Sequence, residues 1–415
     1  MEKKRSKTIL PRIDKDFLFI GIPLLLLIGT LVFVNFHHHL PTEQAERQAE
    51  SPRASEPLIE RQLPTDMPTE IPTEIPTEIP TPEPTPVPTL QTMSAADYFL
   101  SHTGEEAYES WIREFSGEKS VFADGTETEI TSRYSYAMFG GYPNAKAYEY
   151  LLQTLKQMVP EDQITIEPYT YRDGGGNPTW YNVVVTFPGT LNPDEQILYA
   201  AHFDSCVSTS GHNPLELAPG ADDNGTGIAA LLEAIPTFAK TTFDRTLKVV
   251  FFSGEENFQE GSKAYVAAHS GENIIGMLNM DMFGNDADED RCFEIHVGPL
   301  EGSDTIGKAV KQAIADLGLD MTYDYFPREL HENHIKGDHN PFWDAGIPAV
   351  TVMENFSAAS TVGGCGEGIA DPSPNWHTDT DFITDISISY AFDIARAGTI
   401  AALDLAGAHE IIVEP

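Results

Sequence analysis

The chain has 415 residues, of which 64 are acidic and 25 are basic, so its formal net charge is −39. This balance argues against nucleic-acid binding, because phosphate recognition requires clustered Lys and Arg side chains. Hydrophobic residues make up 41% of the chain, which is enough for a substantial core in one large domain or two ordinary ones. The three cysteines are too few for a disulfide scaffold and form no CxxC pattern, so a thiolate-based zinc site is not expected.

The N-terminus predicts a membrane anchor. Residues 2–7 read EKKRSK, and residues 17–36 form an apolar run of twenty residues without a charge. At 1.5 Å per residue, a helix of this length crosses a bilayer core of about 30 Å. The basic residues 1–16 should stay in the cytoplasm, which places the remainder outside it. A cleaved signal peptide is the alternative, but the run is long and is followed by His37 to His39, a poor cleavage site.

Residues 37–92 predict a spacer rather than a domain. The sequence PTEI occurs three times over residues 68–79 and then changes into PTPEPTPVPT. Frequent proline removes backbone donors and favours extended polyproline II, so this Pro/Thr/Glu-rich segment reads as a disordered stalk. A recognition ligand for a proline-binding module is the alternative.

Residues 93–415 have the composition of one globular domain. Apolar runs predict strands over residues 181–187, 196–201, 247–253, 274–280 and 349–353. Helical periodicity predicts helices over residues 144–159, 225–239, 258–269, 304–317 and 386–405. Strands that alternate with helices indicate an α/β fold, with a mostly parallel sheet between layers of helices.

Acidic and imidazole side chains follow the predicted strands. The segments are AHFDS at 201–205, GADDNGTG at 220–227, SGEE at 253–256, NMDM at 279–282 and, near the C-terminus, NWHTDTD at 375–381. Since ligand sites of such sheets lie at the carboxyl ends of strands, these groups should gather at one edge. They would repel one another there without a cation. Imidazole and carboxylate donors without thiols suit a pair of Zn²⁺ ions, with Co²⁺ or Mn²⁺ as substitutes.

In this order and spacing the segments resemble metallopeptidase family 28, a family of dizinc aminopeptidases, as a membrane-anchored member of bacterial type. The resemblance covers about residues 95–405 and includes GDHNPFW at 337–343. It implies the zinc exopeptidase fold, a phosphorylase/hydrolase-like central mixed sheet sandwiched by helices.

The resemblance also assigns metal ligands by position. It places His202 and Asp281 on one zinc, Glu256 and His377 on the other, and Asp222 between the two. Asp223 then reads as an acid at the start of the following helix.

The resemblance gives Glu255 the role of general base. Asp204 would accept a hydrogen bond from His202 and fix its tautomer. A metal-bridged hydroxide would attack the scissile carbonyl while Glu255 moves the proton to the leaving amine. The implied activity is aminopeptidase cleavage of peptides outside the cytoplasm. Two alternatives stay open: a glutaminyl-cyclase-like or carboxypeptidase-type reaction on this scaffold, and a non-catalytic displayed ectodomain.

Oxyanion stabilisation is where this sequence departs from several relatives. Trp376 stands where they carry a tyrosine before the last histidine ligand, so its indole N–H becomes the candidate donor. Tyr323 and Tyr325 are alternative donors, and His339 is a candidate near the substrate. The specificity pocket is expected in loops 282–292 and 355–375. We also hypothesise a disulfide between Cys206 and Cys365, because both neighbour segments that converge on the metals.

Overall fold

The computed structural model describes residues 91–123, 125–135, 144–171, 179–209, 211–326, 335–357, 365 and 370–413. The chain divides into two units, Met1–Glu83 and Pro84–Pro415, and the described residues all belong to the second. The expected anchor and nearly all of the expected stalk lie outside them. Within the described part, no helix has the length and apolar character needed to span a membrane.

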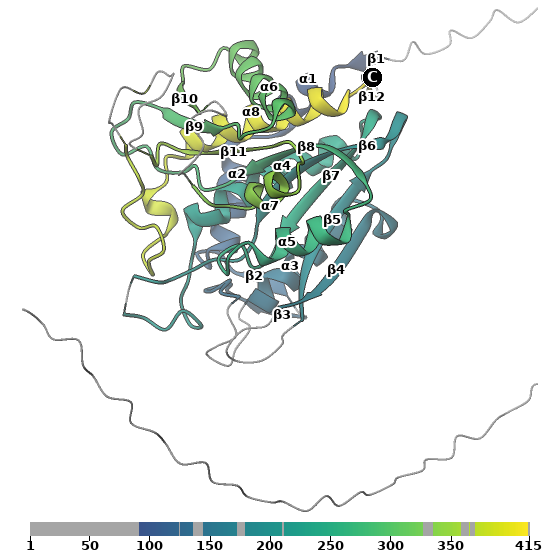
Figure 1. Ribbon diagram of the computed structural model, residues 1–415. Coiled ribbons are helices and arrows are strands. Elements are labelled where there is room, and N and C mark those ends of the chain that lie inside the picture. The colour runs from purple at the N-terminus through teal and green to yellow at the C-terminus, as the bar shows by residue number, and fades with distance from the viewer. Residues whose placement is uncertain are drawn as a thin grey trace, which may run out of the picture. The chain divides into compact units, whose positions relative to one another are not determined.

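Eight strands form one mixed sheet in the order β10-β9-β11-β8-β6-β7-β5-β4 (Figure 1). In chain order they are β4 (Ile164–Thr170), β5 (Thr179–Phe187), β6 (Gly189–His202), β7 (Phe243–Phe252), β8 (Asn273–Met280), β9 (Cys292–His296), β10 (Thr322–Phe326) and β11 (Ala349–Glu354). The four adjacent strands β11, β8, β6 and β7 are mutually parallel, as are β10 and β9. The remaining pairings, β9 with β11, β7 with β5 and β5 with β4, are antiparallel.

Helices cover both faces of this sheet. They are α1 (Ala95–His102), α2 (Glu105–Phe115), α3 (Asn144–Met158), α4 (Gly227–Phe238), α5 (Glu260–Ala268), α6 (Glu301–Leu317), α7 (His339–Asp344) and α8 (Ile388–Ala406). One face packs against α4 and α8, with α6 beside α8, and the other packs against α5 and α7 (Figure 1). Short strands complete the unit: β1 (Gln91–Met93) pairs with β12 (Ile411–Val413), and β2 (Val121–Ala123) pairs with β3 (Thr126–Thr128).

The central strand β6 shows why the sheet needs helices on both sides. Tyr199 and Ala201 belong to the core beneath α4 and α8, whereas Leu198 and Ala200 belong to the separate core beneath α5 and α7. All four side chains are fully buried, so both faces of this strand avoid water. The predicted α/β architecture with a mixed sheet between helices is confirmed.

The five strands and five helices predicted from sequence are all present; their ends differ by at most four residues, except that β6 begins seven residues before the predicted start. Strands β9 and β10 were not predicted, because each carries buried charged residues that break an apolar run. Glu294 and His296 lie in β9 and Asp324 lies in β10, each at most 1% exposed. In β4, Pro168 interrupts the pattern, as suits a strand at the sheet edge.

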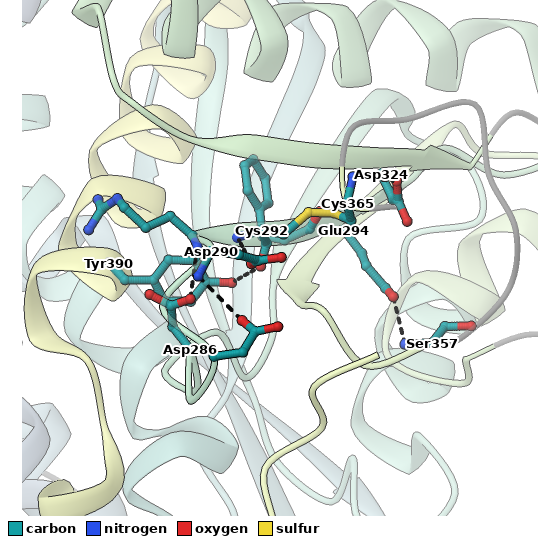
Figure 2. The surroundings of a disulfide bond; sticks show 11 residues. Asp286, Asp290, Cys292, Glu294, Asp324, Ser357, Cys365 and Tyr390 are labelled. Atoms are coloured by element: carbon teal, nitrogen blue, oxygen red, sulfur yellow. Dashed lines mark hydrogen bonds between the residues drawn. A yellow bond between two sulfur atoms is a disulfide. The ribbon is translucent and has the colours of Figure 1, made fainter. Parts of the chain in front are cut away.

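The disulfide hypothesis is wrong in one partner. Cys365 bonds to Cys292, at the start of β9, with a Cα–Cα distance of 5.6 Å, and Cys206 is free. Figure 2 shows the disulfide beside Glu294 and Asp324. The Asp324 carboxylate accepts a hydrogen bond from the main-chain N–H of Cys365. The pairing of Cys365 with Cys206 assumed that Cys365 stays near the last motif, which follows it in the sequence. The fold places Cys365 next to β9 instead.

Candidate metal centre

Two adjacent parallel strands place the first pair of predicted ligands. His202 is the last residue of β6, and Asp281 directly follows β8. Because β6 and β8 are neighbours with the same direction, both side chains lie at one edge of the sheet. The Nε2 atom of His202 is 3.2 Å from Oδ1 of Asp281, and both residues are buried.

The turn after β7 carries Glu255 and Glu256, and Asp204 holds it in place. The Asp204 carboxylate accepts the main-chain N–H groups of Glu255 at 3.1 Å and of Glu256 at 3.3 Å. Gly254 precedes them with a φ of +71°, and a Cβ atom there would lie 2.6 Å from the ring of Trp180. The glycine is therefore required for the turn to pass this ring.

Asp204 was expected to accept a hydrogen bond from His202. The Nδ1 atom of His202 lies 3.1 Å from the main-chain oxygen of Asp204 and 3.5 Å from its Oδ1. The main-chain oxygen is thus the nearer acceptor, and it fixes Nε2 as the nitrogen that faces the site. The carboxylate mainly serves the turn that carries the two glutamates.

Asp223, and not Asp222, lies between the two histidines. Its Oδ1 is 3.2 Å from Nε2 of His202 and its Oδ2 is 3.3 Å from Nε2 of His377, so each oxygen faces a different imidazole. Asp223 has a non-helical backbone, with φ −103° and ψ 91°. It is therefore not an acid in the first turn of the following helix, and the bridging position predicted for Asp222 is corrected to Asp223.

Asp222 points away from the histidines. Its Oδ1 accepts the main-chain N–H of Gly284 at 2.7 Å. Burial raises the pKa of Asp222 to about 6, partly offset by a hydrogen bond with Glu354, which is fully buried. Asp222 and Glu354 therefore form a buried acid pair behind the site.

His377 and Glu256 form the second half of the centre. The Nε2 atom of His377 is 3.0 Å from Oε2 of Glu256. The ring of Trp376 stacks on the His377 ring with centroids 4.0 Å apart and meets Phe356 edge-on at 5.2 Å. The aromatic pair thus forms a wall next to the last predicted ligand.

The charges at this centre indicate a place for cations. Burial opposes protonation of His377, but the Glu256 and Asp223 carboxylates outweigh burial and raise the pKa of His377 to about 11. Burial likewise opposes protonation of His202, yet Asp281 and its neighbours raise the pKa of His202 well above its usual value. These carboxylates therefore draw positive charge to the point where both imidazoles meet them.

The donors fit divalent metal ions. Asp223, Glu256 and Asp281 supply carboxylate oxygens, and both imidazoles turn Nε2 toward these oxygens. Within the part of the chain that the structure describes, Oε1 of Glu256 is buried and has no hydrogen-bond partner. A buried carboxylate oxygen without a hydrogen bond destabilises the folded chain unless a cation or a donor contacts it. This donor chemistry suits zinc.

Two buried residues that sequence reasoning missed support the loop of Asp223. The Asp381 carboxylate accepts the main-chain N–H groups of Asp222 at 3.0 Å and of Asp223 at 3.1 Å. The Arg133 guanidinium donates to the main-chain oxygens of Phe203 and of residues 219 and 220. Asp381 was visible in the WHTDTD segment, whereas no pattern in the sequence marks Arg133.

A cavity of about 310 Å³ opens beside these residues. Glu255 lines it and is 9% exposed, and Gln259 donates a hydrogen bond from Nε2 to Oε1 of Glu255 at 3.0 Å. Burial raises the pKa of Glu255 well above its usual value. The other walls are mainly apolar and are formed by Phe258, Met282, Ile335, Lys336, Met353, Phe356 and Trp376.

The remaining predicted residues divide into those inside and those outside this cavity. Trp376 lines it and is 38% exposed, and Met282 and Phe356 come from the predicted specificity loops. Tyr323 and Tyr325 do not line it, and the hydroxyl of Tyr325 donates to Asp304 instead.

His339 is fully buried and lies near Asp281. A Cβ atom at Gly337 would lie 3.0 Å from Asp281 and 3.2 Å from His339, so both residues flank this glycine. His339 is not among the residues that line the cavity. A direct contact with substrate is therefore not supported for His339.

Comparison with known proteins places the chain in a peptidase family. The model of Peptidase family M28 matches residues 182–399, just over half of the chain. Aminopeptidase YwaD of Bacillus subtilis is 26% identical over 55% of this chain and 46% of its own length. Leucine aminopeptidase 1 of Trichophyton equinum is 27% identical over 52% of this chain and 55% of its own length. The chain thus spans about half the length of these curated relatives.

Solved structures share the fold. The LapA aminopeptidase of Legionella pneumophila superposes with a TM-score of 0.54 and 17% identity, over 75% of this chain and 74% of that chain. The glutaminyl cyclase of Porphyromonas gingivalis superposes with a TM-score of 0.54 and 18% identity, over 73% of this chain and 99% of that chain. At these identities the likeness shows a common architecture that serves two different reactions.

Proposed function

Because the chain belongs to Peptidase family M28, we propose that it is a zinc-dependent aminopeptidase with two metal ions. The observation that carries the proposal is Asp223, whose two carboxylate oxygens each face a different histidine. This arrangement would let one residue serve both ions, with His202 and Asp281 on one and His377 and Glu256 on the other. Paired zinc would supply Lewis acidity, which polarises a carbonyl and makes water a nucleophile at neutral pH.

Glu255 would move the proton during hydrolysis. Gln259 occupies Oε1 of Glu255, which leaves Oε2 to take a proton from the attacking water and to return it to the leaving amine. Trp376 would donate its indole N–H toward the oxygen of the scissile carbonyl, since it lines the same cavity. The free α-amine of a peptide would be attracted by the carboxylates around the histidines. Recognition of that amine is what restricts cleavage to the N-terminal residue.

Glu255→Gln is the test of this assignment. We expect kcat to fall by about 10²–10⁴-fold, because the amide cannot accept the proton of water, while zinc content stays unchanged. Activity is measured on aminoacyl-nitroanilides and metal by elemental analysis. Two other substrates are the controls: an N-acetylated peptide should not be cleaved, and an N-terminal glutaminyl peptide should be hydrolysed rather than cyclised. Cyclisation of the glutaminyl peptide would instead identify a glutaminyl-cyclase-like enzyme.

We further propose that the catalytic unit is displayed outside the cytoplasm on a single membrane anchor. The apolar run at residues 17–36, its basic N-terminal flank and the proline-rich segment that follows support this placement. The substrates would then be peptides present outside the cytoplasm.

A further inference from the structure

We propose that the thiol of Cys206 is an additional ligand of the metal ion held by Glu256 and His377. The proposal rests on the function proposed above. The Sγ atom of Cys206, a carboxylate oxygen of Glu256 and a ring nitrogen of His377 all lie within 4.8 Å of one another. This set combines sulfur, oxygen and nitrogen donors around one point. No motif in the sequence predicts it.

The Glu256 carboxylate also points to a cation at this position. Its side chain is 5% exposed, and one oxygen, Oε2, contacts His377 at 3.0 Å. In the described residues the other oxygen, Oε1, is buried without a hydrogen-bond partner. A cation next to Cys206 would neutralise this carboxylate and satisfy its free oxygen.

The fold holds Cys206 at this position from both sides. On one side, the Ser205 hydroxyl donates to the main-chain oxygen of Ala218 at 2.7 Å. On the other, the main-chain N–H groups of Ser208 and Thr209 donate to the main-chain oxygen of His377 at 3.0 and 3.3 Å. The segment that carries the thiol is therefore tied directly to the residue that carries the imidazole.

Cys206 carries a free thiol. Cys206 is in no disulfide, whereas Cys292 and Cys365 are bonded to each other, so only the Cys206 sulfur is available. On binding, the thiol would release its proton to solvent and form a bond from sulfur to the metal. The other donor group, His202, Asp223 and Asp281, has no sulfur. The two ions would thus have different donor sets, and the one at Cys206 would favour softer metals.

Spectroscopy of the full-length protein tests the proposal without relying on activity. Loaded with Co²⁺, the protein should show a near-ultraviolet sulfur-to-cobalt charge-transfer band. Cys206→Ser should lose this band, while Glu216→Gln, a change at an exposed position ten residues further along the chain, keeps the thiol and should retain it. Zinc X-ray absorption of the unaltered protein should show a sulfur neighbour at about 2.3 Å. Cys206→Ser should weaken binding of one of the two ions by at least about tenfold.

The outcomes separate this proposal from the function on which it depends. Two bound zinc ions with only nitrogen and oxygen neighbours would overturn the role of Cys206 and leave the aminopeptidase assignment intact. Absence of any bound transition metal would overturn both. The zinc absorption measurement uses the unaltered chain, so it decides the question even if Cys206→Ser does not fold.

Discussion

Asp222 and Asp223 carry the same carboxylate one residue apart, yet they face different partners. Asp223 meets both histidines, while Asp222 meets the main chain of Gly284 and lies near Glu354. The tandem in GADDNGTG offers no periodicity to separate the two, since the segment is neither strand nor regular helix. Only the backbone angles of the loop decide which carboxylate enters the site.

Exchanging each aspartate for asparagine distinguishes the two positions. Asp223→Asn should lower metal affinity by at least about 10–100-fold and abolish most activity, because the amide is a poor ligand for two cations. Asp222→Asn keeps an oxygen that can accept from Gly284, so it should retain both metals. Metal content and kcat/KM of the two variants check this. If Asp223→Asn kept both metal ions and Asp222→Asn lost them, Asp222 would be the residue that serves both ions, as predicted from the sequence.

At the scale of elements, helices α2 and α4 pack together through a buried acid. The indole N–H of Trp111 in α2 donates to Oε1 of Glu233 in α4 at 2.7 Å. Glu233 is 8% exposed, and burial raises its pKa from 4.5 to about 7, despite the hydrogen bond from Trp111. The carboxyl group is therefore held in its neutral form more readily in the folded chain than in the unfolded one.

The raised pKa of Glu233 makes the stability of the folded chain depend on pH. Between pH 4.5 and about 7 the folded chain binds more protons at Glu233 than the unfolded chain. The contribution of Glu233 to stability therefore declines as pH rises through this range. Glu233→Gln keeps the acceptor for Trp111 and removes the titration. The free energy of unfolding of the variant should match that of the wild type near pH 4.5. Above pH 7 it should be larger by up to roughly 3 kcal/mol. Denaturant unfolding across this range measures the difference, and a constant difference at all pH values would contradict the prediction.

At the scale of the whole molecule, the proposed anchor and the proposed catalytic unit occupy separate parts of the sequence. The apolar run ends at residue 36, whereas the described elements begin with β1 at Gln91. The sheet, its helices and the candidate centre are built from residues after this point, and the intervening segment is rich in proline. Attachment to a membrane and catalysis should therefore depend on different parts of the chain.

Deletion of residues 1–36 tests this separation. The full-length chain should sediment with membranes and remain there after a high-salt wash, because about twenty apolar residues insert stably. The deleted chain should be recovered in the soluble fraction with aminopeptidase kcat/KM unchanged. Deletion of residues 68–87 alone is the control, and it should leave membrane retention intact. A soluble full-length chain would rule out the anchor.

The sequence by itself determined the α/β class and marked most of the residues that meet at the candidate metal centre. His202 and Asp281 follow apolar runs that form neighbouring parallel strands, and the carboxyl ends of such strands lie at one sheet edge. The tertiary structure alone decided the partners that depend on loops: Asp223 rather than Asp222, and Cys292 rather than Cys206 for Cys365. A strand buried on both faces is marked in the sequence by an apolar run, whereas side-chain directions in loops depend on contacts with residues far away in the chain.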